Sequence, residues 1–533
     1  MKTRKILKNK YYLYMTEFFA GMSVMAVELA ASRLLAPYFS SSQIVYTIII
    51  GTVMIAMALG NIWGGRTADK NPDPDRLYMR LIIASVWIAA IPLVGKYIIL
   101  GISALLVFTV SSNLLTWAAF CTCMVIFVFP LFLLGTVTPS LVKYTVDSLD
   151  DSGKVVGTLG AFNTVGSIIG TFLPTFVTIP AVGTSVTFLI FSGILLILGI
   201  IYFVSEKTKL VKCIVSAVLF LGCSVSAFFD SFAFWESNLL YEGESIYNYL
   251  QVKEDEDSVI LSTNVLFGVQ SIMKKDDSLT GMYYDYALAA PVMAGVCEKE
   301  EAKILVLGMG TGTYATQCHR YFDQVSVEGV EIDQKITDLA RAYFCLPETV
   351  QVTTYDGRAF LNVNRETYDV IMVDAYQDIT IPFQMSSREF FQMVQEHLNE
   401  NGVMVVNMNM HTDKEGNINQ YLSDTIASVF DTVYTVDVTG STNRELFAFM
   451  GEKPLAQFQE ATEELSDTGL RNMMETVAAN LEQYEKGTYL LTDDKAPVEL
   501  LGMSVIDELI QNEVGYYKKV FEEEGVGGLL DSF

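Results

Sequence analysis

The sequence predicts a multi-pass α-helical membrane domain fused to an α/β domain with a doubly wound sheet. Three observations support this fold class. The chain has 533 residues, which is too many for one hydrophobic core. Long uncharged apolar runs occupy residues 1–229, whereas residues 230–533 have the composition of a globular protein. From residue 303 onward, strand patterns alternate with helical patterns, as they do in doubly wound α/β sheets.

The first domain, residues 1–229, is expected to cross a membrane about seven times. Its first apolar run follows a basic segment and is too long for the apolar part of a signal peptide, so we interpret it as a retained span. Residues 97–110 are apolar but short, which suits a re-entrant or interfacial segment. The predicted spans are 12–37, 43–64, 78–95, 114–137, 155–180, 183–204 and 211–229.

Basic residues before the first span, among them Lys2 and Lys10, place the N-terminus in the cytoplasm by the positive-inside rule. Lys207, Lys209 and Lys212 agree if six spans precede them. A seventh span would carry the second domain outside, although the nucleoside that this domain is predicted to bind is made in the cytosol. We expect a multi-pass, lipid-contacting protein of the cell membrane with a cytosolic second domain, so that one run does not cross or the span count differs by one.

Three ionisable residues fall in the first span, namely Glu17, Glu28 and Arg33. Ionisable groups at membrane depth are costly and are often functional, so these residues are candidates for a transport or substrate path. The alternative is local pairing between Glu28 and Arg33.

The formal charge divides at the same point as the hydropathy. Residues 1–229 hold 16 Lys and Arg against 9 Asp and Glu, whereas the remainder holds 19 against 52, so the halves carry +7 and −33 within the total of −26. An acidic half repels nucleic acid and attracts cations such as polyamines. A solvated acidic surface without a ligand has the same composition.

Cysteine and histidine usage argues against a disulfide framework and against a metal site. The seven cysteines are scattered without a C-x-x-C pair, which fits a reducing compartment. His319, His397 and His411 lack metal-ligand spacing. We therefore expect no bound metal and no permanently bound cofactor.

The second half begins with a small β-rich subdomain, assigned to residues 230–280, in which short alternating segments fill about 245–275. Residues 281–533 are assigned to the α/β domain, with a helix at 387–398. Its predicted strands are "KILVLG", "QVSVEGVEI", "VQVTTY", "YDVIMVD", "GVMVVNMN" and "TVYTVDV".

Three glycines, Gly308, Gly310 and Gly312, follow the first of these strands and precede a helix. Glycines in this place let the backbone approach a ligand closely. The next strand ends at Glu331, about 20 residues further on, where a carboxylate accepts both ribose hydroxyls. A plain structural turn and a dinucleotide site share these features.

The third strand is followed by "YDGRAFL", in which Asp356 can accept the exocyclic amine of adenine and Gly357 lets the base lie against the backbone. This element favours adenosine in a methyltransferase-like (Rossmann-like) sheet over a dinucleotide. The fourth strand ends at Asp374, where a carboxylate can hold an attacking ammonium group and take its proton. A helix or turn cap is the alternative for Asp374.

An ordered set of stretches in residues 240–500 resembles the spermidine synthase (polyamine aminopropyltransferase) family. These stretches are "GVQS", "MYYDYALAAPVM", "LVLGMGTGTYATQ", "VEID", "YDGRAFL", "YDVIMVDAYQ" and "IPF". The apolar half, with "ELAASRLLAPYF" and "GGRTADK", resembles the membrane-fused subgroup of that family, together with "LLTDDKAPVE" near the far end.

The resemblance implies transfer of an aminopropyl group from decarboxylated S-adenosylmethionine to a polyamine, such as putrescine to give spermidine and methylthioadenosine. It implies that Asp374 is the catalytic base and that the Gly308–Gly312 loop, Glu331, Asp356 and Gly357 hold the donor. It further assigns Gln270 to the donor pocket and Tyr283, Asp285 and Tyr376 to substrate binding.

One departure from the family pattern lies in the glycine loop. The family usually has an aspartate where this chain has Thr311, and an acidic residue where it has Gln317. Methyl or aminocarboxypropyl transfer from intact S-adenosylmethionine is therefore a second hypothesis. A transporter or polyamine sensor that binds a nucleoside without turnover is a third, and a homo-oligomer is compatible with each.

Overall fold

The computed structural model places two compact units along the chain. The first comprises Met1–Ser237, Glu242–Tyr249 and Asn264–Leu266, and the second comprises the rest. The described residues are all except 1–5, 7, 8, 108, 111, 147–151, 228–230, 235, 237, 265–267, 376–380, 410, 411, 413, 452–454, 509, 510, 512–514, 516–518 and 520–533.

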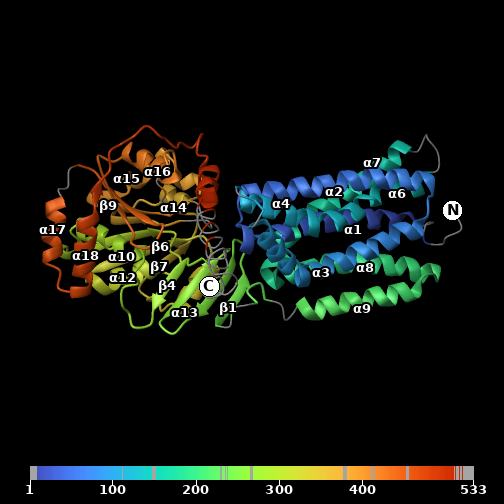
Figure 1. Cartoon of the computed structure of the whole chain (residues 1–533), viewed down its shortest axis with the longest axis horizontal. Coiled ribbons are helices and arrows are strands. Elements are labelled where there is room, and N and C mark those ends of the chain that lie inside the picture. The colour runs from blue at the N-terminus through green and yellow to red at the C-terminus, as the bar shows by residue number, and fades with distance from the viewer. Residues whose placement is uncertain are drawn as a thin grey trace. The chain divides into compact units, whose positions relative to one another are not determined.

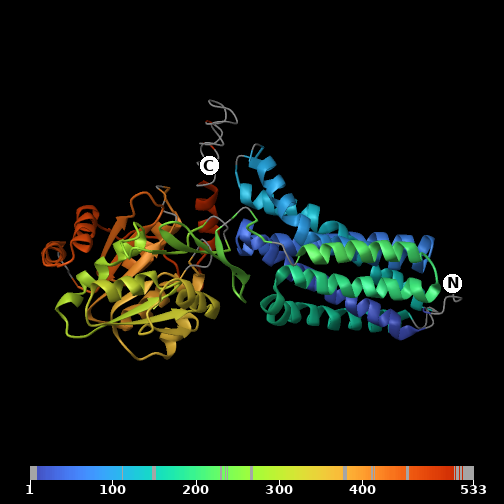
Figure 2. The same ribbon diagram turned by 90° about the horizontal axis from the view of Figure 1, so that it is seen from below.

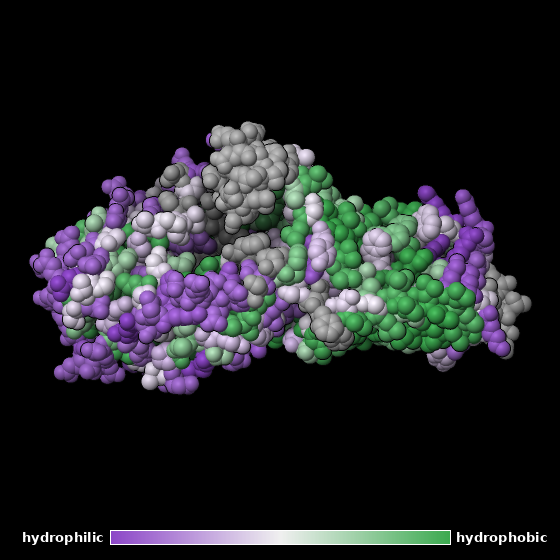
Figure 3. Space-filling view, turned by 60° about the horizontal axis from the view of Figure 1, so that its bottom comes forward, coloured by the Kyte–Doolittle hydropathy of each residue, from purple (hydrophilic) through white to green (hydrophobic). Residues whose placement is uncertain are grey.

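The first unit is a bundle of long apolar helices (Figure 1). Six described helical segments are long and apolar enough to cross a membrane, and one of them is the 55-residue stretch Ser152–Glu206, which comprises α7, η2 and α8. Hydrophobic residues cover much of the face of this bundle that Figure 3 shows. The helices are α1 Lys10–Phe39, α2 Gln43–Lys70, α3 Pro74–Val107, α4 Leu114–Ile126, α5 Val128–Gly135, α6 Val137–Thr145, α7 Ser152–Leu173, the π-helix η2 Pro174–Thr178, α8 Ile179–Glu206 and α9 Leu210–Ala227.

Residues 97–110 do not form a separate re-entrant segment. Residues 97–107 continue α3, which runs unbroken for 34 residues to Val107, or about 51 Å. The apolar run was split in the sequence because Lys96 interrupts it. In the structure Lys96 is buried and its ammonium group donates to the Ser231 carbonyl oxygen at 2.9 Å.

The 55-residue apolar stretch Ser152–Glu206 reverses direction near Gly183. Gly183 has φ +81°, which breaks the helix. The Thr187 hydroxyl lies 2.9 Å from the Thr178 hydroxyl, whereas nine residues of continuous helix would separate them by about 13 Å. Glu244 accepts from both the backbone N–H and the hydroxyl of Thr184 at 2.5 Å, and so caps the helix that starts after the turn.

The two ends of the first unit lie at opposite ends of its helix bundle. At one end the Ile6 N–H donates to Glu206, the last residue of α8. At the other, Arg33 near the end of α1 donates to the Ile246 carbonyl oxygen. If every helix crosses a membrane, residues that precede α1 and residues that follow α9 are therefore on opposite sides. With a cytosolic N-terminus, a bundle in which every helix crosses would therefore place the residues after α9 on the other side of the membrane.

Helices α1 and α7 pack backbone to backbone. A Cβ atom added at Gly166 would lie 2.0 Å from the Phe18 carbonyl oxygen, and one at Gly170 would lie 2.1 Å from the Met22 carbonyl oxygen. Small residues at such contacts let helices approach closely, which is the main source of helix association where no hydrophobic effect acts between them.

The second unit contains the four-stranded sheet β1-β2-β3-β4 and a larger sheet. Residues 238–241 and 250–263 of the small sheet belong to this unit. Its strands are β1 Leu239–Glu244, β2 Tyr249–Glu254, β3 Ser258–Thr263 and β4 Ser271–Lys274. The sheet starts at residue 239, before the segment 245–275 that the alternation predicts.

The larger sheet has the order β12-β10-β11-β9-β8-β5-β6-β7. Strands β9, β8, β5, β6 and β7 are parallel, and β10 and β11 form an antiparallel extension beside β9. The strands are β5 Ala302–Leu307, β6 Val325–Glu331, β7 Gln351–Thr354, β8 Tyr368–Val373, β9 Leu398–Met408, β10 Thr432–Asp437, β11 Arg444–Phe449 and β12 Glu482–Gln483.

Helices lie on both faces of this sheet (Figures 1 and 2). They are α10 Tyr283–Ala287, α11 Ala289–Met293, α12 Thr313–Tyr321, α13 Gln334–Tyr343, α14 Gly357–Val363, α15 Arg388–Glu396, α16 Ile418–Ala427, α17 Leu455–Glu463 and α18 Thr468–Asn480, with the 3₁₀ turns η3 Val296–Glu298 and η4 Phe383–Met385. Hydrophobic residues from the strands and from α10, α11, α12 and α18 form the main core.

The sheet is mixed, and strand β11 was not predicted. Residues 445–449 are buried on both faces, so the strand lacks the alternation that identifies a half-exposed strand. It also carries Glu445 at 0% exposure, and a carboxylate inside an apolar run argues against a core strand in a sequence.

We expect Gly166→Ala to destabilise the first unit by about 1–3 kcal/mol, because its methyl group would overlap the Phe18 carbonyl oxygen and force α1 and α7 apart. All four tryptophans, at positions 63, 87, 117 and 235, lie in this unit. Thermal unfolding followed by tryptophan fluorescence therefore measures its stability alone.

Gly160→Ala is the matched control, since a Cβ at Gly160 on the same helix meets nothing within 4 Å. This variant should be neutral or gain up to about 1 kcal/mol from helix propensity. Equal midpoints for the two variants would contradict the packing argument.

Candidate active site

The loop after β5 needs its three glycines. Gly308, Gly310 and Gly312 have φ of +86°, +55° and +80°, a region that side chains disfavour. A Cβ at Gly308 would lie 2.5 Å from the Asp374 carbonyl oxygen. At Gly310 it would lie 2.9 Å from the Ser271 hydroxyl. The loop is therefore pressed against both β4 and the end of β8.

Glu331, at the end of β6, faces this loop. Its carboxylate accepts from the Gly310 N–H at 2.9 Å and from the Asp333 N–H at 3.0 Å. Burial raises the pKa of Glu331 to about 7, against the lowering effect of those N–H donors. The carboxylate is thus fixed beside the glycine loop and is readily ionised by a ligand that donates hydrogen bonds.

Asp356 and Gly357 stand at the start of α14, after β7. Asp356 caps this helix, since its Oδ1 accepts from the Ala359 N–H at 2.8 Å. A Cβ at Gly357 would lie 3.1 Å from the Met385 methyl group. A cap role is the alternative considered for Asp374. In the structure, Asp356 caps a helix, α14.

Asp374 follows β8, and its two oxygens have different donors. The Tyr283 hydroxyl donates to Oδ2 at 2.7 Å, and the Asn407 amide donates to Oδ1 at 2.9 Å. The Asn443 amide donates in turn to the Asn407 side-chain oxygen at 2.8 Å. Burial raises the pKa of Asp374 to about 7, although both donors lower it. A carboxylate with a pKa near neutrality is suited to take a proton.

Tyr283 and its neighbour Tyr284 form an aromatic wall beside Asp374. Their ring centroids lie 3.9 Å apart, and both rings are buried. The Tyr284 hydroxyl donates to the Gln270 carbonyl oxygen at 2.7 Å, so the backbone of Gln270 is held at this wall. The structure thus places the Gln270 backbone against Tyr284, next to the Tyr283 ring whose hydroxyl contacts Asp374.

Asp285 has a different environment from the one predicted. It is fully buried, and its carboxylate accepts from the Thr280 N–H and hydroxyl, the Gly281 N–H and the Gln317 amide at 2.6–3.1 Å. Because these donors occupy both oxygens of the Asp285 carboxylate, few acceptor positions remain for an amine. Its geometry fits an anchor for the turn before α10, with Gln317 as a neutral partner.

Glu445 is the site residue that sequence reasoning missed. It lies in β11 opposite Asn407 of β9, it is 0% exposed, and neither carboxylate oxygen has a hydrogen-bond partner among the described residues. Burial, and then the charge of Asp374, raise the pKa of Glu445 well above its usual range. The carboxyl group of Glu445 therefore lies close enough to Asp374 for the two charges to interact, and no described residue donates a hydrogen bond to it.

Thr311 is buried in the glycine loop and lines a cavity of about 350 Å³. Its N–H donates to the Ser271 hydroxyl at 3.3 Å. The charged residues of the cavity lining are Lys274, Arg320 and Asp277, so the space beside Thr311 carries one excess positive charge.

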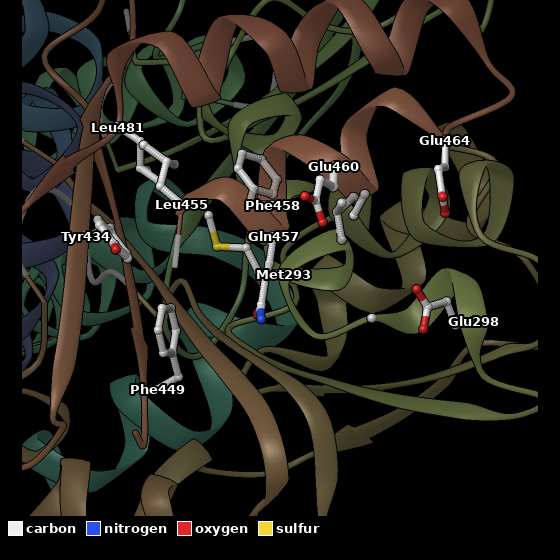
Figure 4. A pocket seen from close by; sticks show the side chains of 13 residues that line it. Met293, Glu298, Tyr434, Phe449, Leu455, Gln457, Phe458, Glu460, Glu464 and Leu481 are labelled. Carbon is white, nitrogen blue, oxygen red and sulfur yellow. The ribbon is translucent and has the colours of Figure 1, made fainter. Parts of the chain in front are cut away.

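A second cavity, of about 300 Å³, contains none of the predicted site residues (Figure 4). Its side chains come from α11, β10, β11 and the α17 region, with Phe449, Phe458 and Leu481 on its apolar wall. It is separate from the Asp374 site.

Tyr376, predicted to bind substrate, lies outside the described residues, as do Asp378 and His411. Among the residues that the structure describes, no group of three or more His, Cys, Asp or Glu side chains is arranged to hold a metal ion.

Comparison with known proteins agrees with this geometry. Residues 287–459 match the spermine/spermidine synthase domain. Over 351 residues the chain is 55% identical to a probable polyamine aminopropyl transferase of Bifidobacterium longum, a match that covers 62% of this chain and 77% of that protein.

The chain belongs to the polyamine aminopropyltransferase family. It is 24% identical to the polyamine aminopropyltransferase of Vibrio vulnificus, across 54% of this chain and 99% of that protein. A crystal structure of a spermidine synthase in complex with the transition-state analogue AdoDATO aligns at 19% identity with a TM-score of 0.37, covering 45% of this chain and 85% of the other. The protein is a transferase of the spermidine synthase type, with a mixed sheet of the Rossmann-like methyltransferase fold.

We expect kcat/KM for aminopropyl transfer to fall about tenfold per pH unit below a pH of about 7, because a protonated Asp374 accepts no proton. Tyr283→Phe should move this acid limb to higher pH, since the Tyr283 hydroxyl lowers the pKa of Asp374. Initial rates across a pH series at low amine concentration measure both effects.

Tyr286→Phe is the control, because the Tyr286 hydroxyl contacts Thr439 at 3.2 Å and not Asp374. Asp374→Asn should lower turnover by about 10²-fold or more. An acid limb that stays in place in Tyr283→Phe would remove this hydrogen bond from the mechanism.

Proposed function

We propose that this protein is a membrane-bound enzyme that moves the aminopropyl group of decarboxylated S-adenosylmethionine to an amine such as putrescine, giving spermidine and methylthioadenosine. The observation that carries the proposal is the pair of carboxyl groups formed by half-buried Asp374 and fully buried Glu445, with Asp374 next to a glycine loop faced by Glu331. Two anionic groups suit an acceptor that is a dication.

In this proposal the donor's adenosine lies along the carboxyl ends of β5, β6 and β7. Glu331 accepts from the ribose hydroxyls, Asp356 and Gly357 lie against the adenine, and Gln270 borders the donor. This placement is supported by the position of Glu331 beside Gly310 and by the absence of side chains at Gly308 and Gly310.

The reaction needs one proton acceptor. The neutral amine nitrogen attacks the methylene carbon next to the sulfonium, a C–N bond forms, the C–S bond breaks, and the electron pair stays on sulfur in methylthioadenosine. The proton leaves the nitrogen for Asp374. Tyr283 and Asn407 hold this carboxylate in place through its two oxygens, so that positioning and proton removal supply the catalysis.

Glu445 is assigned to the second ammonium group of the acceptor. A buried carboxylate with two unpaired oxygens is costly unless a cation or donor completes it. A bound diamine would offer one ammonium to Glu445 and the other amine to Asp374, which would lower the pKa of both carboxyls.

A second candidate function is transfer from intact S-adenosylmethionine, either of a methyl or of an aminocarboxypropyl group. The observation that favours it is the space beside Thr311, which lacks the family's aspartate and is lined by Lys274 and Arg320. A donor tail with a carboxylate would be repelled less here than in a relative with the aspartate.

We expect the wild type to turn over decarboxylated S-adenosylmethionine, and Thr311→Asp to bind that donor equally well or about tenfold to a hundredfold more tightly through an added ion pair. The variant should disfavour intact S-adenosylmethionine. Mass spectrometry of products from both donors and both proteins, with putrescine as acceptor, provides the measurement.

Thr313→Ser is a control for disturbance of the loop, since it keeps the hydroxyl that donates to the Ile272 carbonyl oxygen. A wild type that uses intact S-adenosylmethionine faster would overturn the proposed donor in favour of the second candidate. Binding without any product would instead favour a sensor.

The membrane location is supported by the six long apolar helices and by the apolar surface of the bundle. Two arguments about which side of the membrane each end of the chain occupies oppose each other. Fourteen of the sixteen Lys and Arg residues up to position 229 precede α1, begin it, or lie in or beside the α2–α3, α6–α7 and α8–α9 connections, which favours a cytoplasmic N-terminal end. The cytosolic supply of the donor favours a cytosolic catalytic unit.

We expect protease-sensitive reporters fused before Met1 and after Phe533 to show opposite accessibility in intact cells, because the first unit has its two ends at opposite ends of the bundle. A protected C-terminal reporter would place the catalytic unit in the cytosol, and a cleaved one would place it outside.

A reporter in the α2–α3 connection, at Pro72, is the internal control and should match the one before Met1. Two termini on the same side would show that one helix, such as α9, does not cross.

A further inference from the structure

Glu17 is a carboxylate enclosed in the helical bundle. It lies seven residues into α1, about 10 Å from the start of that helix, and is 0% exposed. The Thr138 hydroxyl of α6 and the Asn163 amide of α7 both donate to its Oε1, at 2.5 Å and 2.8 Å. Three helices therefore meet at one carboxylate oxygen.

The donors orient this carboxyl group. A distance of 2.5 Å between hydroxyl and carboxylate oxygens lies in the range of charge-assisted O–H···O⁻ hydrogen bonds, which favours the ionised form. Both donors contact Oε1, and neither contacts Oε2.

The backbone of the bundle is shaped to bring Asn163 to Glu17. Gly21 lies one turn after Glu17 on α1, and a Cβ there would fall 2.6 Å from the Asn163 carbonyl oxygen and 3.0 Å from the Ser167 hydroxyl. Any larger residue at Gly21 would push α7 away and separate the Asn163 amide from Glu17.

The second oxygen of Glu17 has no partner. Oε2 is buried without a hydrogen bond, and Glu17 forms no ion pair with any residue that the structure describes. An ionised carboxylate in such a place is strongly unfavourable unless a positive charge compensates it. A positive charge at Oε2 would provide that compensation.

We propose that Glu17 is the anionic ligand of a monovalent-cation site in the bundle, with Thr138 and Asn163 as its positioning residues. A single carboxylate with neutral neighbours matches one positive charge, whereas divalent ions take several carboxylates. Alkali ions and primary ammonium groups, including the ends of polyamines, share this chemistry. The inference is independent of the proposed function, because no catalytic residue contributes to the site.

The test uses the full-length protein in detergent, with N-methylglucamine as the bulky background cation at constant pH and ionic strength. The probes are sodium, potassium, methylammonium and putrescine. Tryptophan fluorescence reports only the first unit, which holds all four tryptophans. We expect one class of probe to raise the unfolding midpoint in a saturable manner, by about 5 °C at 100 times its dissociation constant.

Glu17→Gln should abolish this rise, and Thr138→Val should shift it to higher cation concentration. Glu28→Gln is the matched control on the same helix, 11 residues further on, and should keep the wild-type response. A response to sodium or potassium assigns an alkali ion, and a response confined to methylammonium and putrescine assigns an ammonium group.

Two results would overturn the proposal. One is an equal response of wild type and Glu17→Gln to every cation. The other is a carboxylic-acid carbonyl band in the infrared spectrum that is absent from Glu17→Gln and unaffected by cations, since it would show a neutral Glu17. A cooperative thermal transition in the tryptophan signal of each variant shows that the first unit is folded, and retained aminopropyl transfer shows that the second unit is folded.

Discussion

The active site depends on the close approach of the Gly308–Gly312 loop to the ends of its neighbouring strands. With no Cβ at Gly308, the loop backbone contacts the residues that follow β8, and Asp374 is thereby placed at the edge of the donor loop. Without one at Gly310, the loop N–H reaches Glu331 and the β4 strand lies against the turn. Every other site residue is positioned relative to this contact.

The pKa values of the carboxyl groups in the site are set more by burial than by their hydrogen-bond partners. Asp374 and Glu331 each keep two hydrogen-bond donors, and the pKa of each is nevertheless raised to about 7. Glu445 has no donor, and its pKa is raised further. A polycation that enters such a site compensates the negative charges of these carboxylates, which the protein itself does not pair. The affinity for the polycation is therefore coupled to the ionisation of the carboxyl groups.

The parts of the site that the sequence predicts are those set by local pattern. Gly308, Glu331 and Asp374 each follow a strand whose periodicity is visible, and the parallel order of β5, β6 and β8 brings them together. Glu445 was missed because the fully buried β11 carries no alternation. The environment of Asp285 was missed because its capture by Thr280, Gly281 and Gln317 is a matter of tertiary packing. The reversal at Gly183 separates two of the seven predicted spans, 155–180 and 183–204.

Glu445 belongs to the antiparallel β10–β11 extension, whereas the donor loop belongs to the parallel strands. In the proposed function, the two substrates are therefore recognised by separate supersecondary elements, which meet at Asp374 and Asn407. Mutations in the hairpin can retune the length or charge of the accepted amine while the nucleoside loop stays intact. A change of product on this fold then requires mutations only in the β10–β11 hairpin, and the transfer reaction itself stays the same.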